Sequence, residues 1–177
     1  MRPVMRSAAR LLARVLPSLQ ALLATVNRLV IGLGMIALLL AAAVLTGAVF
    51  LRYFLHQATD WQDEVAVFLL VGTTFLCSAY VQQKRGHIGI EALVGLLPAR
   101  VNRARALAVD VVCCLFCAFF TWKSLTLFLE AIDEGQTTSS TWAPPLAIPY
   151  GLMLAGMFLL TVQMLFQVLA AIGTTQE

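Results

Sequence analysis

The chain has 177 residues, of which 60% are hydrophobic and 12% are charged, with a net charge of +3. Soluble domains average about 25% charged residues, so the composition excludes an ordinary water-soluble domain and leaves much of the surface for lipid. The length suits one unit of four membrane-spanning helices. The basic residues fall in alternate connections, so they indicate topology and contact with anionic phospholipids rather than nucleic-acid binding.

Residues 1–25 are predicted to form a basic amphipathic arm that precedes a four-span domain at 26–172. Arginines recur every four residues from Arg2 to Arg14, which places them along one stripe of a helix. We expect this helix to lie on the inner membrane surface, with its arginines at anionic headgroups. We also expect Pro17 to break or restart it. A docking arm for a partner protein is the alternative interpretation.

The first predicted span, at 28–51, contains 23 consecutive uncharged residues. This run is too long for the core of a signal peptide and long enough to cross the hydrocarbon layer. It has no ionisable group, so it cannot by itself bind a cation or relay a proton. Its glycines at positions 32, 34 and 47 would let another helix approach closely. The second predicted span, at 61–83, begins with two acids in its first turn, where the helix dipole favours anions.

A short amphipathic helix is predicted at 88–97, because apolar residues recur there at helical spacing until Pro98. The third predicted span, at 106–129, contains Asp110 and Lys123. These two charges either reach the lipid headgroups or pair with other helices of this chain or of a partner.

The fourth span is predicted at 147–171, and Pro149 suits the first turn of such a helix. Gln163 and Gln167 lie one turn apart on one face of it. Amides inside a membrane require hydrogen-bond partners, so both glutamines should face another helix.

The charges of the connections alternate in sign along the chain, from the basic arm through an acidic, a basic and a second acidic connection. Basic connections stay in the cytoplasm, so this order predicts that both termini are cytoplasmic. Aromatic residues near the predicted outer ends of the spans form an interfacial belt. They are Tyr53, Trp61, Trp122, Trp142 and Tyr150. The sequence therefore predicts an all-α, multi-pass membrane protein.

Cys114 and Cys117 form a Cys-x-x-Cys pair, which raises the alternative of a four-helix membrane thiol oxidoreductase. All four cysteines lie inside predicted spans, and the outer connections contain no cysteine to relay a disulfide. His56 and His87 are predicted on opposite sides of the membrane, so they cannot share a haem or a metal. We therefore expect no cofactor, no metal site and no enzymatic activity. A small proton-coupled exporter would need an embedded carboxylate in its first span, and none is present.

Several short elements occur in an order that resembles a known family. They are Arg52-Tyr53 closing the first span, Trp61-Gln-Asp-Glu64 opening the second, Arg85-Gly-His87-Ile-Gly-Ile-Glu91 after it, Gly135-Gln-Thr-Thr138 before Pro144-Pro145, and Ile148-Pro149 opening the last span. Over about residues 28–170 the chain resembles the small membrane subunit of tripartite ATP-independent periplasmic (TRAP) transporters. Ile90 and Glu91 depart conservatively from the usual Val and Asp, and the basic arm lies outside the pattern.

The resemblance implies a division of labour in a bacterial inner membrane. A periplasmic substrate-binding protein captures an organic acid, which is a C4-dicarboxylate, another carboxylate or a sugar acid. A large multispan subunit then carries the acid together with sodium, so sodium is expected on that subunit. The small subunit scaffolds and anchors the large one.

Eight residues are expected to serve this structural role or to contact the partner or lipid. They are Arg52, Tyr53, Trp61, Asp63, Glu64, Arg85, His87 and Pro149. We expect Arg52 to pair with an acid that opens the second span and so to brace the outer corner, unless these groups are merely solvated ions. The acids concerned are Asp60, Asp63 and Glu64. Arg85 and His87 would hold a lipid phosphate or cap the 88–97 helix, unless they are ordinary inner-side basic residues.

Overall fold

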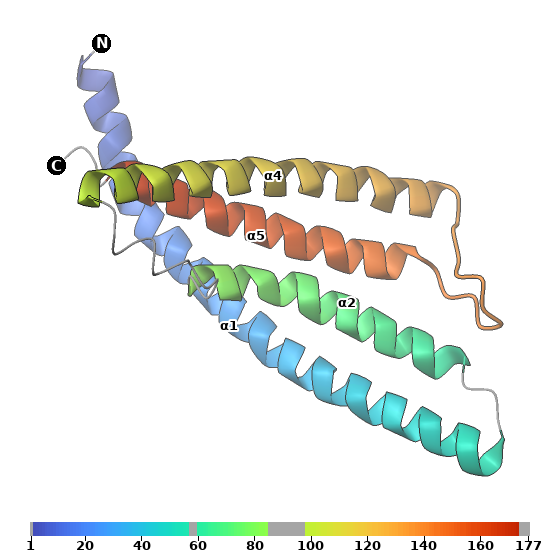
Figure 1. Ribbon diagram of the computed structural model, residues 1–177. Coiled ribbons are helices and arrows are strands. Elements are labelled where there is room, and N and C mark those ends of the chain that lie inside the picture. Colours follow the sequence, from blue (N-terminus) through green and yellow to red (C-terminus); the bar gives the residue numbers. More distant parts are fainter. Residues whose placement is uncertain (1, 57–59, 85–97, 174–177) are drawn as a thin grey trace.

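A computed structural model shows an all-α chain whose four helices lie side by side in one layer (Figure 1). The structure describes residues 2–56, 60–84 and 98–173, with side chains at 20–56, 61–84, 98 and 101–172. The helices are α1 (Arg2–Leu55), α2 (Asp60–Gln83), α4 (Ala99–Asp133) and α5 (Ala147–Gly173). Each contains a stretch long and apolar enough to cross a membrane, which confirms the predicted fold class and its four spans.

Two helices extend well beyond their predicted spans. The span predicted at 106–129 is part of the 35-residue α4, and α1 is a continuous helix of 54 residues. The break expected at Pro17 is therefore wrong. A proline removes one backbone hydrogen bond, and the alanine, leucine and arginine residues around it favour the helix strongly enough to continue it.

The amphipathic helix predicted at 88–97 lies outside the described residues, and so do Arg85 and His87. The same holds for the side chains of residues 2–19, which form most of the predicted arm. The orientation of that arm on a membrane surface therefore stays a prediction.

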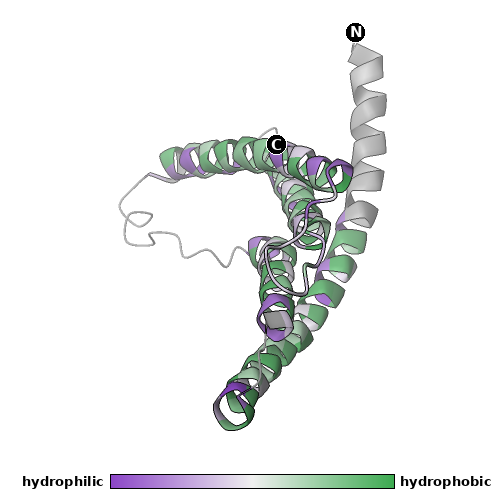
Figure 2. Cartoon of the chain, turned by 90° about the vertical axis from the view of Figure 1, so that its right-hand side faces the viewer, coloured by the Kyte–Doolittle hydropathy of each residue, from purple (hydrophilic) through white to green (hydrophobic). Residues whose placement is uncertain are grey.

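The helices pack in the spatial order α1, α2, α5, α4, with a minor contact between α1 and α5. Two antiparallel hairpins, α1–α2 and α4–α5, are thus joined through the parallel pair α2–α5 (Figure 1). Viewed from the side, the layer is curved, with apolar residues along the helices and more polar residues toward their ends (Figure 2).

Buried residues recur every seven positions along the helices. In α1 the buried row is Asn27, Gly34, Ala41 and Ala48, and in α4 it is Asp110, Cys117, Ser124 and Ala131. A repeat of seven is typical of helices that pack at a small crossing angle with interlocking side chains. The central helix α5 has two such rows, one for each neighbour. They are Pro149, Gly156 and Gln163, and Met157 and Met164.

Two glycines allow the closest approaches between helices. A Cβ atom added at Gly156 would overlap the backbone of Phe75 in α2, and one added at Gly34 would overlap the Cys77 sulfur. In contrast, a Cβ atom at Gly32 or Gly47 would meet nothing within 4 Å. Of the three glycines expected to admit a neighbouring helix, Gly34 therefore does so within this chain.

The loop between α4 and α5 begins with a glycine-dependent helix end. Gly135 has a φ of +61°, and the next amide, Gln136 N–H, donates to the Ala131 carbonyl over 3.0 Å. This geometry satisfies a carbonyl that the helix leaves unpaired, and glycine adopts it without steric cost.

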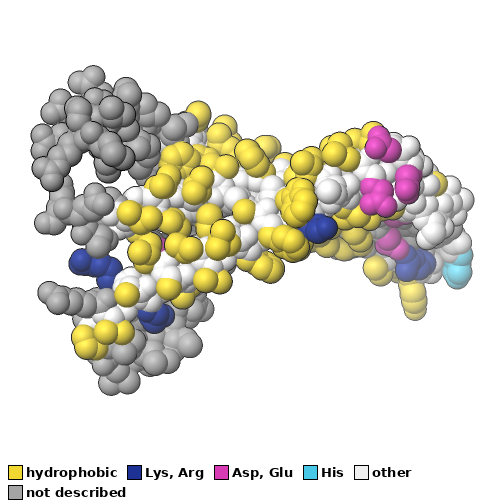
Figure 3. Space-filling model, turned by 90° about the horizontal axis from the view of Figure 1, so that it is seen from above, with side chains coloured by type: hydrophobic (Ala, Val, Ile, Leu, Met, Phe, Trp, Pro, Cys, Tyr) yellow, Lys and Arg dark blue, Asp and Glu magenta, His cyan; other side chains and the backbone are white. Residues whose placement is uncertain are grey.

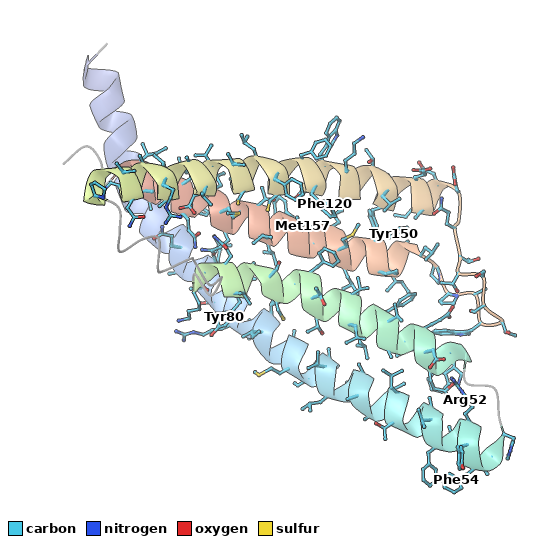
Figure 4. All side chains as sticks on the ribbon, viewed as in Figure 1. Arg52, Phe54, Tyr80, Phe120, Tyr150 and Met157 are labelled. Atoms are coloured by element: carbon cyan, nitrogen blue, oxygen red, sulfur yellow. The ribbon has the colours of Figure 1, made fainter. Side chains whose placement is uncertain are left out.

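Because the layer is one helix thick, most apolar side chains face outward. Only 11% of the most apolar 18-residue stretch of α1 is buried, against 28% in α5. A small buried cluster lies between α4 and α5, where Phe120 packs against Cys117, Met157 and Met164 (Figure 4). The exposed surface between the two ends is largely hydrophobic (Figure 3). Lipid or a partner protein must cover these faces.

Charged side chains sort to the two ends of the layer. We call the end with Arg28, Lys84, Arg103 and Arg105 the basic end, and the end with Asp63, Glu64, Glu130, Asp133 and Glu134 the acidic end. Helices α1 and α4 both begin at the basic end, and α2 and α5 both finish there (Figure 1).

Candidate functional site

At the acidic end, an ion pair joins the last turn of α1 to the first turn of α2. Arg52 Nη2 donates to Asp63 Oδ2 over 2.9 Å (Figure 4). Of the three acids expected as partners, Asp63 forms this pair, and the side chain of Asp60 lies outside the described residues. The two side chains are 59% and 51% exposed, so the pair contributes at most about 1 kcal/mol.

Glu64 and Gln62 differ from Asp63 because each has a buried oxygen. Glu64 Oε2 and Gln62 Oε1 have no hydrogen-bond partner among the described residues. In the same region, Tyr53 and Trp61 are largely exposed. Among the described side chains of this corner, Arg52 and Asp63 form an ion pair.

Pro149 lies in the first turn of α5, as predicted, and it is buried. A proline suits this position because the first-turn amides of a helix have no partner within the helix. It begins the row of α5 residues that continues to Gly156 and Gln163.

Toward the basic end, side-chain amides connect three helices. We call Asn27, Gln82, Gln83, Gln163 and Gln167 the amide cluster. Asn27 Nδ2 donates to Gln83 Oε1 over 3.3 Å and to Gln163 Oε1 over 3.2 Å, so one side chain of α1 contacts both α2 and α5. Asn27 is only 1% exposed.

A second pair in the amide cluster connects α2 to α5. Gln82 Nε2 donates to Gln167 Oε1 over 2.9 Å, and Gln167 Nε2 donates to the Gln82 carbonyl over 3.0 Å. The prediction that Gln163 and Gln167 need partners is confirmed. Neutral amides suit this position because they bond strongly in an apolar medium without the cost of burying a charge.

Three members of the cluster, Asn27, Gln82 and Gln83, were not predicted from the sequence. A signal for Asn27 was present, because it lies seven residues before Gly34 in a row of otherwise small residues. A polar side chain at one position of such a row often fixes the register of packed helices. Gln82 and Gln83 carried no comparable signal, since they lie at the end of a span where amides are common.

The two charged residues of α4 have different surroundings. Asp110 lies in the buried row that faces α5, whereas Lys123 is exposed, with Nζ 5.2 Å from the centre of the Trp122 ring. Within α4, Asp110 is therefore directed toward the chain itself and Lys123 away from it.

Cys77, Cys114 and Cys117 contribute to helix packing, whereas Cys113 is exposed. All four are free thiols, and the Cys117 sulfur lies 3.8 Å from the Met164 sulfur between α4 and α5. Within the described part of the chain, no three His, Cys, Asp or Glu side chains form a group that could hold a metal ion. The alternative of a thiol oxidoreductase at Cys114 and Cys117 is not favoured.

The ion pair joins α1 to α2 at the acidic end, the amide cluster joins α1, α2 and α5 toward the basic end, and α4 packs on α5 between the ends. Four apolar helices held together in this way, with broad apolar faces left open, define a multi-pass membrane protein. The family model described as "Tripartite ATP-independent periplasmic transporters, DctQ component" matches residues 41–174. The chain belongs to this family, and it is a multi-pass protein of the bacterial inner membrane. The resemblance noted from its sequence elements is thereby confirmed.

A curated relative is the "C4-dicarboxylate TRAP transporter small permease protein DctQ" of Vibrio cholerae serotype O1. It is 33% identical over 76 residues, which make up 42% of this chain and 32% of the relative. The match therefore spans about a third of that relative's length.

Proposed function

We propose that this chain is a non-catalytic scaffold that anchors the large multispan subunit of a TRAP transporter in the membrane. A periplasmic substrate-binding protein would deliver an organic acid to that subunit. The observation that carries the proposal is the one-helix-thick layer, in which each helix packs on its neighbours and whose apolar faces are open. Such a layer suits protein and lipid contact better than enclosure of a substrate.

A scaffold role agrees with the placement of polar groups. Between Arg28 and Arg52 the first span has no ionisable residue, so it offers no group for cation or proton movement. The amide cluster and the Arg52–Asp63 pair instead hold α1 against its neighbours at opposite ends. A rigid frame is what a moving transport subunit requires beside it.

In this proposal the partner proteins, and not this chain, bind the substrate and the coupling ion. The name of the curated relative specifies a C4-dicarboxylate for that protein. For this chain we propose the wider class of C4-dicarboxylates, other carboxylates and sugar acids. Sodium would bind the large subunit, and this chain would carry no cofactor.

We propose that the basic end faces the cytoplasm, where Arg28, Lys84, Arg103 and Arg105 would contact anionic phospholipids. Arg85 and His87 would add to the same surface. At the opposite membrane surface, the exposed Tyr53 and Trp61 would serve as interfacial anchors.

The test is to purify a tagged form of the chain, expressed with its native neighbours, in mild detergent. Recovery of one large multispan protein in roughly equal amount is the expected result, and recovery of the chain alone, intact and stable, would contradict the proposal. A tagged four-span protein of another family is the matched control. The double variant Cys114→Ala, Cys117→Ala should retain the partner and the uptake activity, whereas a thiol oxidoreductase would lose its activity.

A further inference from the structure

The two edges of the layer differ in polarity. The α1 edge has no charged side chain between Arg28 and Arg52. The α4 edge, whose helix packs mainly on α5, exposes Lys123 inside its candidate span. Each edge also exposes a threonine, Thr46 on α1 and Thr126 on α4. Figure 3 views the layer from the α4 side and shows basic side-chain surface amid apolar side chains, away from both ends. An ionisable residue within a span usually marks a functional contact.

Lys123 lies inside the candidate span, about two helical turns from Glu130 at the acidic end. Seven residues, or about 10 Å along the helix, separate it from Glu130, and eighteen residues, or about 27 Å, separate it from Arg105. A hydrocarbon core of about 30 Å fits between those two charges. Thr121, two residues away, shares a 2.9 Å hydrogen bond with Thr161, which is fourteen residues into α5. The hydrogen bond therefore places Thr121 beside the middle of α5, between the basic end and the acidic end.

No carboxylate of the described residues lies within ion-pair distance of Lys123. Its ammonium group instead lies beside the Trp122 ring, at 5.2 Å from the ring centre. A contact of this kind offsets only part of the cost of placing a charge in hydrocarbon. A lipid headgroup reached by the lysine side chain, or a counter-charge from outside the chain, would offset the rest of that cost.

Trp122 also lines an apolar groove of about 550 Å³ between α4 and α5. The groove contains Gly151 and Ala155, which are spaced four residues apart on α5. The Phe128 ring of α4 already packs on Gly151, with a ring carbon 3.1 Å from the place of an added Cβ atom, whereas Ala155 is exposed. Ala155 is therefore the small residue at which a helix from outside the chain could approach closely. Trp122 both lines the groove and lies beside the ammonium group, so a single helix could contact both.

We infer that the α4 edge is the docking edge for the large subunit, and that a transmembrane helix of that subunit carries an aspartate or glutamate opposite Lys123. This inference rests on the proposed function. The uncharged α1 edge then faces lipid. Charge complementarity at Lys123 sets the register of the docked helix, and the α4–α5 groove receives its apolar side chains.

A photo-crosslinking experiment on the co-expressed complex tests the choice of edge. Benzoylphenylalanine would replace Phe119 on α4 in one variant and Leu39 on α1 in the other, both of which are exposed. We expect a crosslink to the large subunit from position 119 and not from position 39. The opposite pattern, or no crosslink from 119 while the subunits still purify together, would overturn the docking edge. Failure of the subunits to purify together would instead count against the proposed function.

A charge series at Lys123 tests the ion pair. Lys123→Arg should retain the large subunit, Lys123→Met should lower its recovery about tenfold, and Lys123→Glu should lower it further. The position-119 crosslink locates the docked helix of the large subunit. Replacing the aspartate or glutamate of that helix nearest the crosslink with lysine should restore binding to Lys123→Glu. Equal recovery with Lys123→Met and the unmodified chain would show that the ammonium group only reaches lipid headgroups, and would overturn the pairing.

Discussion

Asn27 shows how one uncharged side chain can organise a membrane protein. It is the polar member of the α1 row that otherwise contains Gly34, Ala41 and Ala48. Apolar side chains gain little free energy by packing against one helix face rather than another, because lipid tails are equally apolar. An amide with two partners on two helices distinguishes the correct register from all others.

Replacing Asn27 with alanine should destabilise the chain by about 1–2 kcal/mol, because Gln83 and Gln163 lose their shared donor. The free energy of unfolding can be measured by denaturant titration in detergent micelles. Thr25→Ala is the matched control, since the exposed Thr25 hydroxyl bonds only within α1, to Ala21. Equal losses in the two variants would contradict a special role for Asn27.

The ion pair at the acidic end makes a smaller contribution because it is open to solvent. Arg52→Glu should cost at most about 1 kcal/mol, and adding Asp63→Arg should recover much of the loss by restoring opposite charges at 2.9 Å. Thermal unfolding in detergent at low and high salt would measure both changes, and salt should reduce the difference. Rescue by Glu64→Arg in place of Asp63→Arg would show that the structure pairs the wrong acid.

At the scale of helices, the rows with a repeat of seven explain why the chain forms a layer. Each of α1 and α4 has one such row and lies at an edge, whereas α5 has two rows and lies between neighbours. Where the rows contain glycine, the helix axes approach closely enough for backbone contact. Gly156 against Phe75 is the tightest example between α2 and α5.

Gly156→Ala should therefore destabilise the α2–α5 contact by about 1–3 kcal/mol, because the obstacle is backbone that cannot rotate away. The matched control is Gly47→Ala, whose new methyl group meets nothing within 4 Å and which favours the helix. Unfolding titrations of both variants would measure the difference. A neutral result at position 156 would mean that the two helices are further apart than the structure shows.

The existence of the four spans was predictable from the sequence, since each is a long uncharged or nearly uncharged run. Their spatial order was not, because apolar residues surround each helix and no simple face points inward. The small residues Gly34, Ala41 and Ala48, at a spacing of seven, mark the face of α1 that packs but not the helix against which it packs. At the acidic end, the sequence narrowed the partner of Arg52 to three acids, Asp60, Asp63 and Glu64. It could not single out Asp63, because the three acids lie within about one turn of α2.

At the scale of the whole molecule, the layer has consequences for motion in a fluid membrane. Four helices set about 10 Å apart make a plate about 40 Å wide and one helix thick. A plate displaces more lipid when it rolls than a compact cylinder of equal volume does. If the plate is fixed to a partner along its α4 edge, it adds viscous drag to the assembly. This drag would slow rotation of the whole assembly in the membrane while the substrate-carrying part moves.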